Sequence, residues 1–228
     1  MTDSLKRAAA RRALEFVDGG MKLGLGTGTT AEAFLELLAE KIRSGLKIVG
    51  AATSRRTEEK ARALGIPLDD LDRLAPLDLA IDGADEADHN LDLIKGGGGA
   101  LLREKIVAAS SRRMMVIADA SKLVDRLGRF PLPVEVTPFG HATTARRIAD
   151  AAARLGCPDL PVRPRAGFAT DSGNAIYDCA FGAIADARGL AAALEAVPGV
   201  VGHGLFIGLA GTLVIAGADG VRLLDRSP

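Results

Sequence analysis

The stretch MKLGLGTGTTAEAFLELLAEKIRSG, residues 21–45, decides the fold class. Met21 to Leu25 form a short apolar run followed by glycine, which is typical of a buried strand. Residues 30–44 then place apolar side chains on one helical face, at Phe34, Leu37, Leu38 and Ile42. Gly45 ends this helix. The stretch therefore predicts a strand, a glycine-rich turn and an amphipathic helix in succession.

The same alternation of strand and helix continues to about residue 129. The further strands that the pattern predicts are 46–52, 77–81 and 114–118. The further helices that it predicts are 4–17, 100–111 and a helix from the Ser54 cap to Gly65. Strands that alternate with helices form parallel sheets with helices on both faces. We therefore expect an α/β fold with a Rossmann-like, mostly parallel sheet.

The pattern changes near Phe130-Pro131-Leu132-Pro133, where prolines favour a sheet edge or a domain crossing over a central strand. The elements predicted beyond this point are a helix at 141–155, strand-like pieces at 167–170 and 174–179, and a short helix at 190–196. We expect residues 130–203 to form a smaller α+β domain, a candidate for oligomerisation. Residues 1–129 with 204–228 would form the Rossmann-like domain. The closing runs 205–207 and 213–215 are candidates to return to its sheet.

The composition excludes several classes of partner. The chain has 228 residues, and its 29 basic and 29 acidic side chains give no net charge, so no global attraction to nucleic acid or an anionic membrane follows. Aromatic residues are 4% with no Trp, which argues against a base-stacking platform. Cys157 and Cys179 stand outside any metal-binding spacing, and we expect buried, reduced thiols in a cytosolic protein.

One uncharged stretch, residues 197–218, has the length of a membrane span. It contains Pro198 and six glycines, however, and its apolar residues fall into two short runs on either side of Gly208-Leu209-Ala210-Gly211. This pattern favours two buried strands with a glycine-rich connection over a membrane helix.

The first candidate site is Gly24 to Thr30, between the first strand and its helix. Glycines allow backbone N–H groups to approach an anion, and the helix N-terminus and threonine hydroxyls add favourable polarity. The dinucleotide fingerprint fails because Thr29 stands in place of its third glycine, and the Gly-Lys-Ser/Thr of a nucleotide P-loop is absent. The loop therefore suits a phosphate. The alternative is that it is a tight turn that serves only packing.

The second candidate site is the acidic stretch from Asp82 to Asp88, directly after the strand that ends at Ile81. Carboxylates at strand ends face the ligand crevice in this architecture and can accept hydrogen bonds from sugar hydroxyls. A divalent cation is a weaker reading, since the aspartates are three residues apart and lack the alternation of a calcium loop. A solvated acidic turn is the remaining alternative.

The third candidate site is Lys95 with Gly96–Gly99, followed by a helix that carries Glu104. Four consecutive glycines are costly to order, which favours a place where backbone approaches a ligand closely. Glu104 shares a helical face with Leu101 and Ala108, so it need not be fully solvated, although most such glutamates are surface residues. Lys122 follows another predicted strand and is either a site residue or a surface lysine.

Together these loops offer anion-binding backbone, carboxylates and lysines, without a motif for a nucleophile or a cofactor. This inventory suits a small phosphorylated polyol and chemistry based on proton transfer. The residues alone do not name the sugar.

At these motifs the chain resembles the type A ribose-5-phosphate isomerase family. The stretches that carry the resemblance are GTGTT at 26–30, DGADE at 82–86, LIKGGGGALLREKIV at 93–107, FPLPVEV at 130–136, TDSGN at 170–174 and GLFI at 204–207. They follow one another over nearly the whole chain, and the lysine–glycine block is highly specific. Two departures are mild: Thr29 replaces the serine common in the family, and Gly202 replaces a larger residue.

The resemblance implies interconversion of ribose 5-phosphate and ribulose 5-phosphate through a cis-enediol, in the non-oxidative branch of the pentose phosphate pathway. It implies no cofactor and no metal, and a cytoplasmic homodimer or homotetramer without nucleic-acid or membrane partners. Glu104 would be the general base, with Lys95, Asp82 and Asp85 as further catalytic residues. The residues expected to bind substrate are Thr27, Gly28, Thr29, Thr30, Asp82, Gly83, Ala84, Asp85, Lys95, Gly96, Gly97, Gly98 and Lys122.

Overall fold

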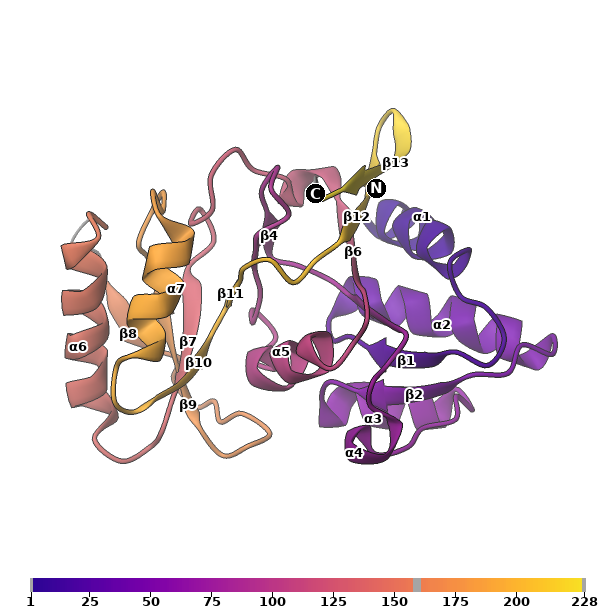
Figure 1. Ribbon diagram of the computed structural model, residues 1–228, viewed down its shortest axis with the longest axis horizontal. Helices are drawn as coiled ribbons and strands as arrows, with labels where there is room; N and C mark the ends of the chain where they lie inside the picture. The colour runs from indigo at the N-terminus through magenta and orange to yellow at the C-terminus, as the bar shows by residue number, and fades with distance from the viewer. Residues whose placement is uncertain (1, 158–160, 227–228) are drawn as a thin grey trace. The chain divides into compact units, whose positions relative to one another are not determined.

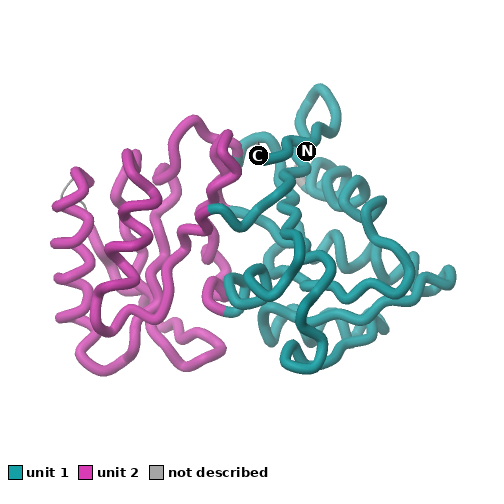
Figure 2. Tube along the Cα trace, in the orientation of Figure 1, with its two compact units in different colours: residues 1–84, 103–122, 208–228 teal, residues 85–102, 123–207 magenta. Residues whose placement is uncertain are grey.

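The protein, seen in a computed structural model, is described for residues 2–157 and 161–226 (Figure 1). Contacts within the chain divide it into two compact units (Figure 2). The first unit comprises residues 1–84, 103–122 and 208–228, and the second comprises 85–102 and 123–207.

This division differs from the predicted boundaries, because residues 85–102, 123–129 and 204–207 fall in the second unit. The reason is a small antiparallel sheet of β11 (Leu205–Phe206), β5 (Leu93–Ile94) and β4 (Glu86–Ala87). The buried Glu86 carboxylate strengthens the connection by accepting hydrogen bonds from the backbone N–H groups of Gly128 at 2.7 Å and Phe130 at 2.6 Å.

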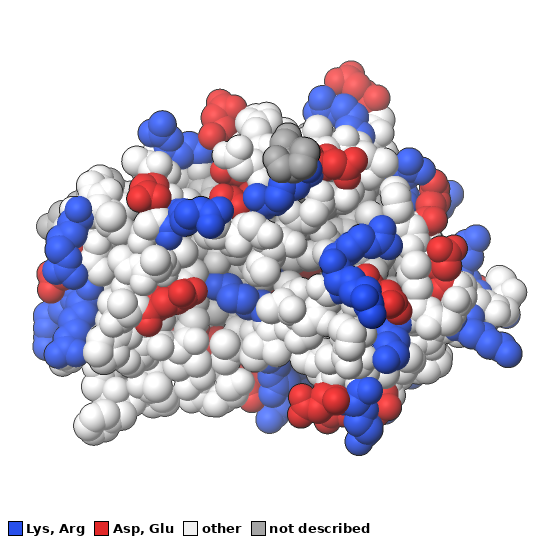
Figure 3. Space-filling view, in the orientation of Figure 1, with Lys and Arg blue, Asp and Glu red and all other residues white. Residues whose placement is uncertain are grey.

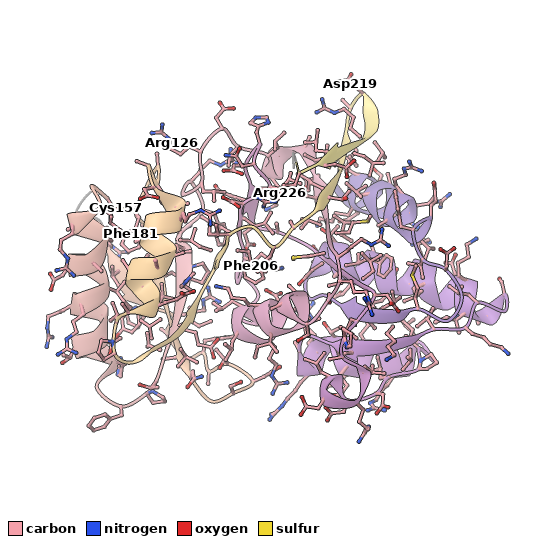
Figure 4. The ribbon with its side chains drawn as sticks, in the orientation of Figure 1. Arg126, Cys157, Phe181, Phe206, Asp219 and Arg226 are labelled. Carbon is pink, nitrogen blue, oxygen red and sulfur yellow. The ribbon has the colours of Figure 1, made fainter. Side chains whose placement is uncertain are left out.

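A six-stranded sheet forms the centre of the first unit, in the order β13-β12-β6-β3-β1-β2. Its strands are β1 (Lys22–Leu25), β2 (Val49–Ala52), β3 (Leu79–Asp82), β6 (Met114–Asp119), β12 (Thr212–Gly217) and β13 (Gly220–Asp225). The helices are α1 (Thr2–Leu14), α2 (Thr29–Arg43), α3 (Arg55–Ala63), α4 (Leu71–Leu74), α5 (Leu101–Ala109, which begins in the second unit) and the 3₁₀ turn η1 (Ala120–Lys122). All pairs are parallel except β12–β13, a hairpin with Asp219 at its turn (Figure 4). The predicted Rossmann-like sheet is confirmed.

Side chains of β1 alternate between the two faces of this sheet. Leu23 and Leu25 belong to a buried cluster with α1 and α2, including Phe34 and Leu38. Gly24 lies on the opposite face, where a Cβ atom would be 2.5 Å from Val107 Cγ1 on α5. A glycine at this position therefore allows α5 to approach the sheet closely, and helices cover both faces as predicted.

The second unit also contains a four-stranded antiparallel sheet in the order β10-β7-β9-β8. Its elements are β7 (Leu132–Val136), β8 (Val162–Pro164), β9 (Ala175–Cys179), β10 (Val200–His203), α6 (His141–Arg154) and α7 (Ala187–Glu195). Cys157 and Phe181, labelled in Figure 4, belong to the buried core of this unit, with Leu190 and Leu194 of α7. The mixed α+β character predicted for this region is confirmed.

The expectation that Pro133 excludes a central strand is wrong, because β7 pairs with both β9 and β10. The pairing of β7 with β10 ends at His203, which lies opposite Val134. Pro133 is therefore beyond the end of this pairing, where a backbone N–H is not required. Gly204 lies beside the proline, and its N–H donates to the Pro133 carbonyl at 2.7 Å. A Cβ on Gly204 would be 2.9 Å from Pro133 Cδ, so the glycine makes room for the ring.

Two further expectations are corrected. Residues 167–170 form a turn and loop, and the strand preceding β9 is β8. Of the two closing runs, 213–215 returns to the parallel sheet as part of β12, but β11 pairs with β5.

The uncharged stretch 197–218 contains the two predicted strands, as β11 and β12, and a third strand, β10, that the pattern did not predict. Within the residues that the structure describes, no helix has both the length and the hydropathy that a bilayer crossing requires.

Candidate active site

The loop from Gly26 to Gly28 connects β1 to α2 and has a shape that requires glycine. Gly28, the N-cap of α2, has φ 104° and ψ 171°, a conformation that other residues rarely adopt. A Cβ on Gly26 would be 2.2 Å from Asp82 Oδ1, so this backbone passes directly over the Asp82 side chain. The exposed Thr29 and the half-buried Thr30 then begin α2, whose N-terminus favours an anion.

Asp82 joins the end of β3 to this loop. Its Oδ1 accepts hydrogen bonds from the backbone N–H groups of Thr27 at 3.1 Å and Gly83 at 2.7 Å, and its side chain is almost fully buried. On Gly83, a Cβ would lie 4.0 Å from the Cβ of Thr30, so the two predicted loops are in contact.

A cluster of hydroxyl groups fixes the same loop from the side of β2. Thr27 Oγ1 lies 2.8 Å from Thr53 Oγ1, 2.8 Å from Ser54 Oγ and 3.0 Å from Thr57 Oγ1. Thr57 also donates to the Gly26 carbonyl at 2.9 Å, and Thr53 donates to the Leu25 carbonyl at 2.9 Å. The Thr27 hydroxyl therefore holds the shape of the loop.

Ser54 is also the N-cap of α3, as predicted, and accepts a hydrogen bond from Thr57 N–H at 3.0 Å. Thr53 and Thr57 were not among the predicted site residues. The signal that could have indicated them is a group of hydroxyl residues directly after a strand end.

Glu104 lies in the first turn of α5 and is 5% exposed. Because α5 connects the parallel strands β3 and β6, it runs against them, and its first turn lies toward their carboxyl ends. Val107 packs over Gly24 of β1, and Glu104 precedes it by nearly one turn on the same side of the helix. The Glu104 carboxylate is thus held toward the end of β1 where the Gly26–Gly28 loop begins.

Lys122 is half-buried at the end of η1, which follows the carboxyl end of β6. Asp119 accepts a hydrogen bond from Ser121 N–H at 3.0 Å, which defines this turn. Since β6, β3 and β1 are adjacent and parallel, Lys122 belongs to the same sheet edge as the two preceding loops.

In the second unit, Lys95 follows β5 and is 2% exposed. Its backbone N–H donates to the Gly204 carbonyl at 2.9 Å, and its Nζ lies 5.6 Å from the ring centroid of Phe206, which Figure 4 labels. A buried ammonium over an aromatic face is a strong local electrostatic feature, because little solvent screens it.

Asp85 lies against the glycine run that Lys95 begins. Its Oδ2 accepts a hydrogen bond from Gly97 N–H at 2.7 Å, and a Cβ on Gly97 would be 2.6 Å from Asp85 Oδ1. The run turns tightly, since Gly96 has φ 104° and its carbonyl accepts from Gly99 N–H at 2.9 Å. Gly97 and Gly98 are exposed, so the bend presents backbone groups to solvent.

The structure thus gathers the predicted site residues into two groups, one in each unit. The group in the first unit comprises Thr27, Gly28, Thr29, Thr30, Asp82, Gly83, Ala84, Glu104 and Lys122. The group in the second unit comprises Asp85, Lys95, Gly96, Gly97 and Gly98. Chain continuity relates them, since Asp85 follows Ala84 and the glycine run leads directly into α5.

The local chemistry of these groups is that of anions and protons. Among residues 2–157 and 161–226, no three or more His, Cys, Asp or Glu side chains are arranged to hold a metal ion. Acidic and basic side chains are interspersed over the face seen in Figure 3, in keeping with zero net charge. Local groups must therefore hold any charged ligand.

These features define an α/β protein of the class that binds small phosphorylated ligands beyond the carboxyl ends of parallel strands. A family model described as ribose 5-phosphate isomerase A (phosphoriboisomerase A) matches residues 49–220. The chain is 58% identical over 229 residues to a ribose-5-phosphate isomerase A of Rhodopseudomonas palustris, and this alignment covers 99% of each protein. The chain belongs to the ribose 5-phosphate isomerase A family.

Solved structures of this family are similar over the whole fold. A ribose 5-phosphate isomerase from Plasmodium falciparum has a TM-score of 0.92 and 40% identity, with coverage of 99% of this chain and 100% of the other. A D-ribose-5-phosphate isomerase in complex with phospho-erythronic acid has a TM-score of 0.91 and 36% identity, with the same coverage.

Proposed function

We propose that the protein interconverts D-ribose 5-phosphate and D-ribulose 5-phosphate, as an aldose–ketose isomerase of the non-oxidative pentose phosphate pathway. The observation that carries the proposal is the similarity to a ribose-5-phosphate isomerase A over 99% of both chains. The related structure in complex with phospho-erythronic acid, a phosphorylated sugar acid, supports the class of substrate.

Glu104 is the proposed general base. After the sugar ring opens, the carboxylate takes the proton from C2, and the electron pair of that bond forms the C1=C2 double bond of a cis-enediolate. The same carboxyl group returns the proton to C1, while C2 becomes the carbonyl carbon. Proton transfer of this kind requires a carboxylate whose position is restricted, and the burial of Glu104 in the first turn of α5 supports this role.

Lys95 is proposed to stabilise the negative charge that develops on oxygen in the enediolate. Its ammonium group is almost fully buried, and charge stabilisation is stronger in a site that little water enters. Asp82 and Asp85 are proposed to orient the sugar hydroxyls and to assist ring opening and proton exchange between O1 and O2. Each already holds backbone N–H groups of a glycine-rich loop, so their carboxylates have fixed positions.

The phosphate group is proposed to bind at Thr27–Thr30 and Lys122. The N-terminus of α2 and the backbone of the Gly26–Gly28 loop supply donors for the phosphate oxygens. Gly83, Ala84 and Gly96–Gly98 are proposed to complete the substrate site with backbone groups. Phosphate binding at one end of the substrate would orient its C1 and C2 atoms for the reaction.

We propose a homo-oligomer, either a dimer or a tetramer, in the cytoplasm, without a cofactor. An assay of ribulose 5-phosphate formation in the presence of a metal chelator tests the activity and its independence of metal together. Formation of product supports the proposal, and a protein that binds ribose 5-phosphate without converting it would instead be a sugar-phosphate sensor.

A further inference from the structure

The glycine bend in the second unit is held by an arginine that none of the site motifs contains. Arg165 follows β8, and its Nη1 lies 3.2 Å from the carbonyl oxygen of Gly96 and 3.2 Å from that of Gly97. Its Nε and Nη2 donate to Asp178 Oδ2 at 3.0 Å and Asp178 Oδ1 at 2.5 Å. One guanidinium group therefore joins a carboxylate on β9 to two consecutive peptide groups of the bend.

These two carbonyl contacts determine where the neighbouring N–H groups point. A trans peptide is planar, and its C=O and N–H bonds point in opposite directions. Holding the Gly96 carbonyl toward Arg165 directs the Gly97 N–H away from it, and this N–H donates to Asp85 at 2.7 Å. Holding the Gly97 carbonyl in the same way directs the Gly98 N–H away from the guanidinium group.

The segment that carries Arg165 is itself anchored to β7 at Thr170 and Asn174. The carboxylate of Glu135, 1% exposed on β7, accepts hydrogen bonds from Thr170 Oγ1 at 2.8 Å and Asn174 Nδ2 at 2.9 Å. Phe168 lies over Gly99, where a Cβ would be 2.1 Å from its Cζ atom, and Arg165 Cζ is 5.4 Å from the Phe168 ring centroid. Two residues of this anchored segment, Arg165 and Phe168, therefore pack against the glycine run.

We infer that Arg165 is a positioning residue for catalysis, which orients the peptide groups of Gly96–Gly98 and, through Gly97, the Asp85 carboxylate. Arg165 acts through the backbone, because it contacts the Gly96 and Gly97 carbonyls. The N–H groups that it orients point away from it. The role rests on the proposed isomerase activity, in which these peptide groups and Asp85 contact the sugar. An arginine suits the task because its planar group presents several donors in a fixed arrangement, which the single ammonium of a lysine cannot reproduce.

The test compares Arg165→Ala with Arg163→Ala, a matched control at an exposed arginine on β8. Three quantities are measured: kcat and KM for ribose 5-phosphate, the amide resonances of Gly97 and Gly98, and recovery of kcat with guanidinium at low, non-denaturing concentrations. We expect Arg165→Ala to lower kcat about tenfold to a hundredfold, with a smaller change in KM. We also expect displaced Gly97 and Gly98 resonances, and a partial recovery of kcat with guanidinium that Arg163→Ala does not show.

Retention of kcat within about twofold, or unchanged Gly97 and Gly98 resonances, would overturn the inference. If Arg165→Ala does not fold, Arg165→Lys provides the same comparison, with the same displaced resonances and loss of kcat expected. The resonances also separate the two proposals. If the unmodified protein does not isomerise ribose 5-phosphate, the proposed function fails, while displaced resonances in the Arg165 variant would still show that Arg165 orients the bend.

Discussion

The carboxylate of Asp82 accepts a hydrogen bond from the backbone N–H of Thr27 at 3.1 Å, so the end of β3 holds the loop that follows β1. A Cβ on Gly26 would collide with the same carboxylate, which makes the contact possible only over glycine. The acidic motif and the first glycine-rich loop are therefore one structural feature, although 55 residues separate the two partners. Asp82 is expected to influence both phosphate binding and chemistry.

Substitutions at Asp82 should separate these two effects. Asp82→Asn retains an oxygen that can accept from Thr27 and Gly83 but loses the charge, so we expect kcat to fall at least about tenfold and KM to change little. Asp82→Ala removes the acceptor as well, so KM for ribose 5-phosphate should also rise, by about tenfold. Steady-state kinetics of the two variants check this. An equal KM in the two variants would mean that the contact of Asp82 with the Gly26–Gly28 loop does not contribute to substrate binding.

Glu104→Gln should lower kcat at least about a hundredfold while KM changes much less, because the amide has nearly the same shape but cannot accept a proton. Glu86, which is buried and accepts hydrogen bonds from the N–H groups of Gly128 and Phe130, offers a control at another buried glutamate. If Glu86→Gln loses activity, its melting temperature should also fall, because Glu86 holds the backbone. Glu104→Gln should lose activity while its melting temperature stays unchanged. Near-normal turnover of Glu104→Gln would exclude Glu104 as the base.

Lys95 and Lys122 should affect different kinetic constants. Lys95→Met preserves the volume of the buried stem and removes the charge, so it should lower kcat at least as much as it weakens binding. Lys122→Met, at a half-buried site at the end of η1, should mainly raise KM. Kinetics with ribose 5-phosphate distinguish the two. If the loss in Lys95→Met were confined to KM, Lys95 would only bind substrate.

The elements around the parallel sheet could be predicted because their apolar patterns are local. The strand before Gly26, the helix with Phe34 and Leu38 and the Ser54 cap of α3 all follow from short stretches of sequence. Proline in β7 misled the prediction, because the compensating feature is Gly204, which is distant in sequence. The two-residue strands β4 and β5 are too short to carry a hydrophobic period, so the boundary between the units differed from the prediction.

The candidate site residues stay a prediction, but the structure shows where each of them lies. In the first unit, motifs after β1, β3 and β6 indicated the candidate residues, since adjacent parallel strands bring their carboxyl ends to one edge. In the second unit, the run of four glycines after Lys95 was the signal, because β5 is a two-residue antiparallel strand. The supporting residues were not predictable in this way. Arg165 contributes through contacts with backbone carbonyls 69 and 68 residues away, and such contacts leave no local pattern.

The two cysteines should be unreactive in the folded protein. Burial raises the pKa of the Cys179 thiol, assisted by the nearby Asp178 charge, and burial also raises the pKa of Cys157. A raised pKa keeps a thiol neutral until the pH is well above the usual range, and only the thiolate reacts. We expect a disulfide reagent at about pH 7.5 to modify neither thiol in native protein and both in denaturant. Rapid reaction of either thiol in the native protein would contradict the burial and the raised pKa described for it.

Proton transfer through a carboxylate is the central claim, and isomerisation in heavy water tests it most directly. A proton held by Glu104 can exchange with solvent before it returns to carbon, so ribulose 5-phosphate formed in heavy water should carry deuterium at C1. Mass spectrometry and proton NMR of the product measure this label. Product whose C1 hydrogen comes entirely from C2, with no deuterium at any conversion or pD, would indicate direct hydride migration and contradict the account.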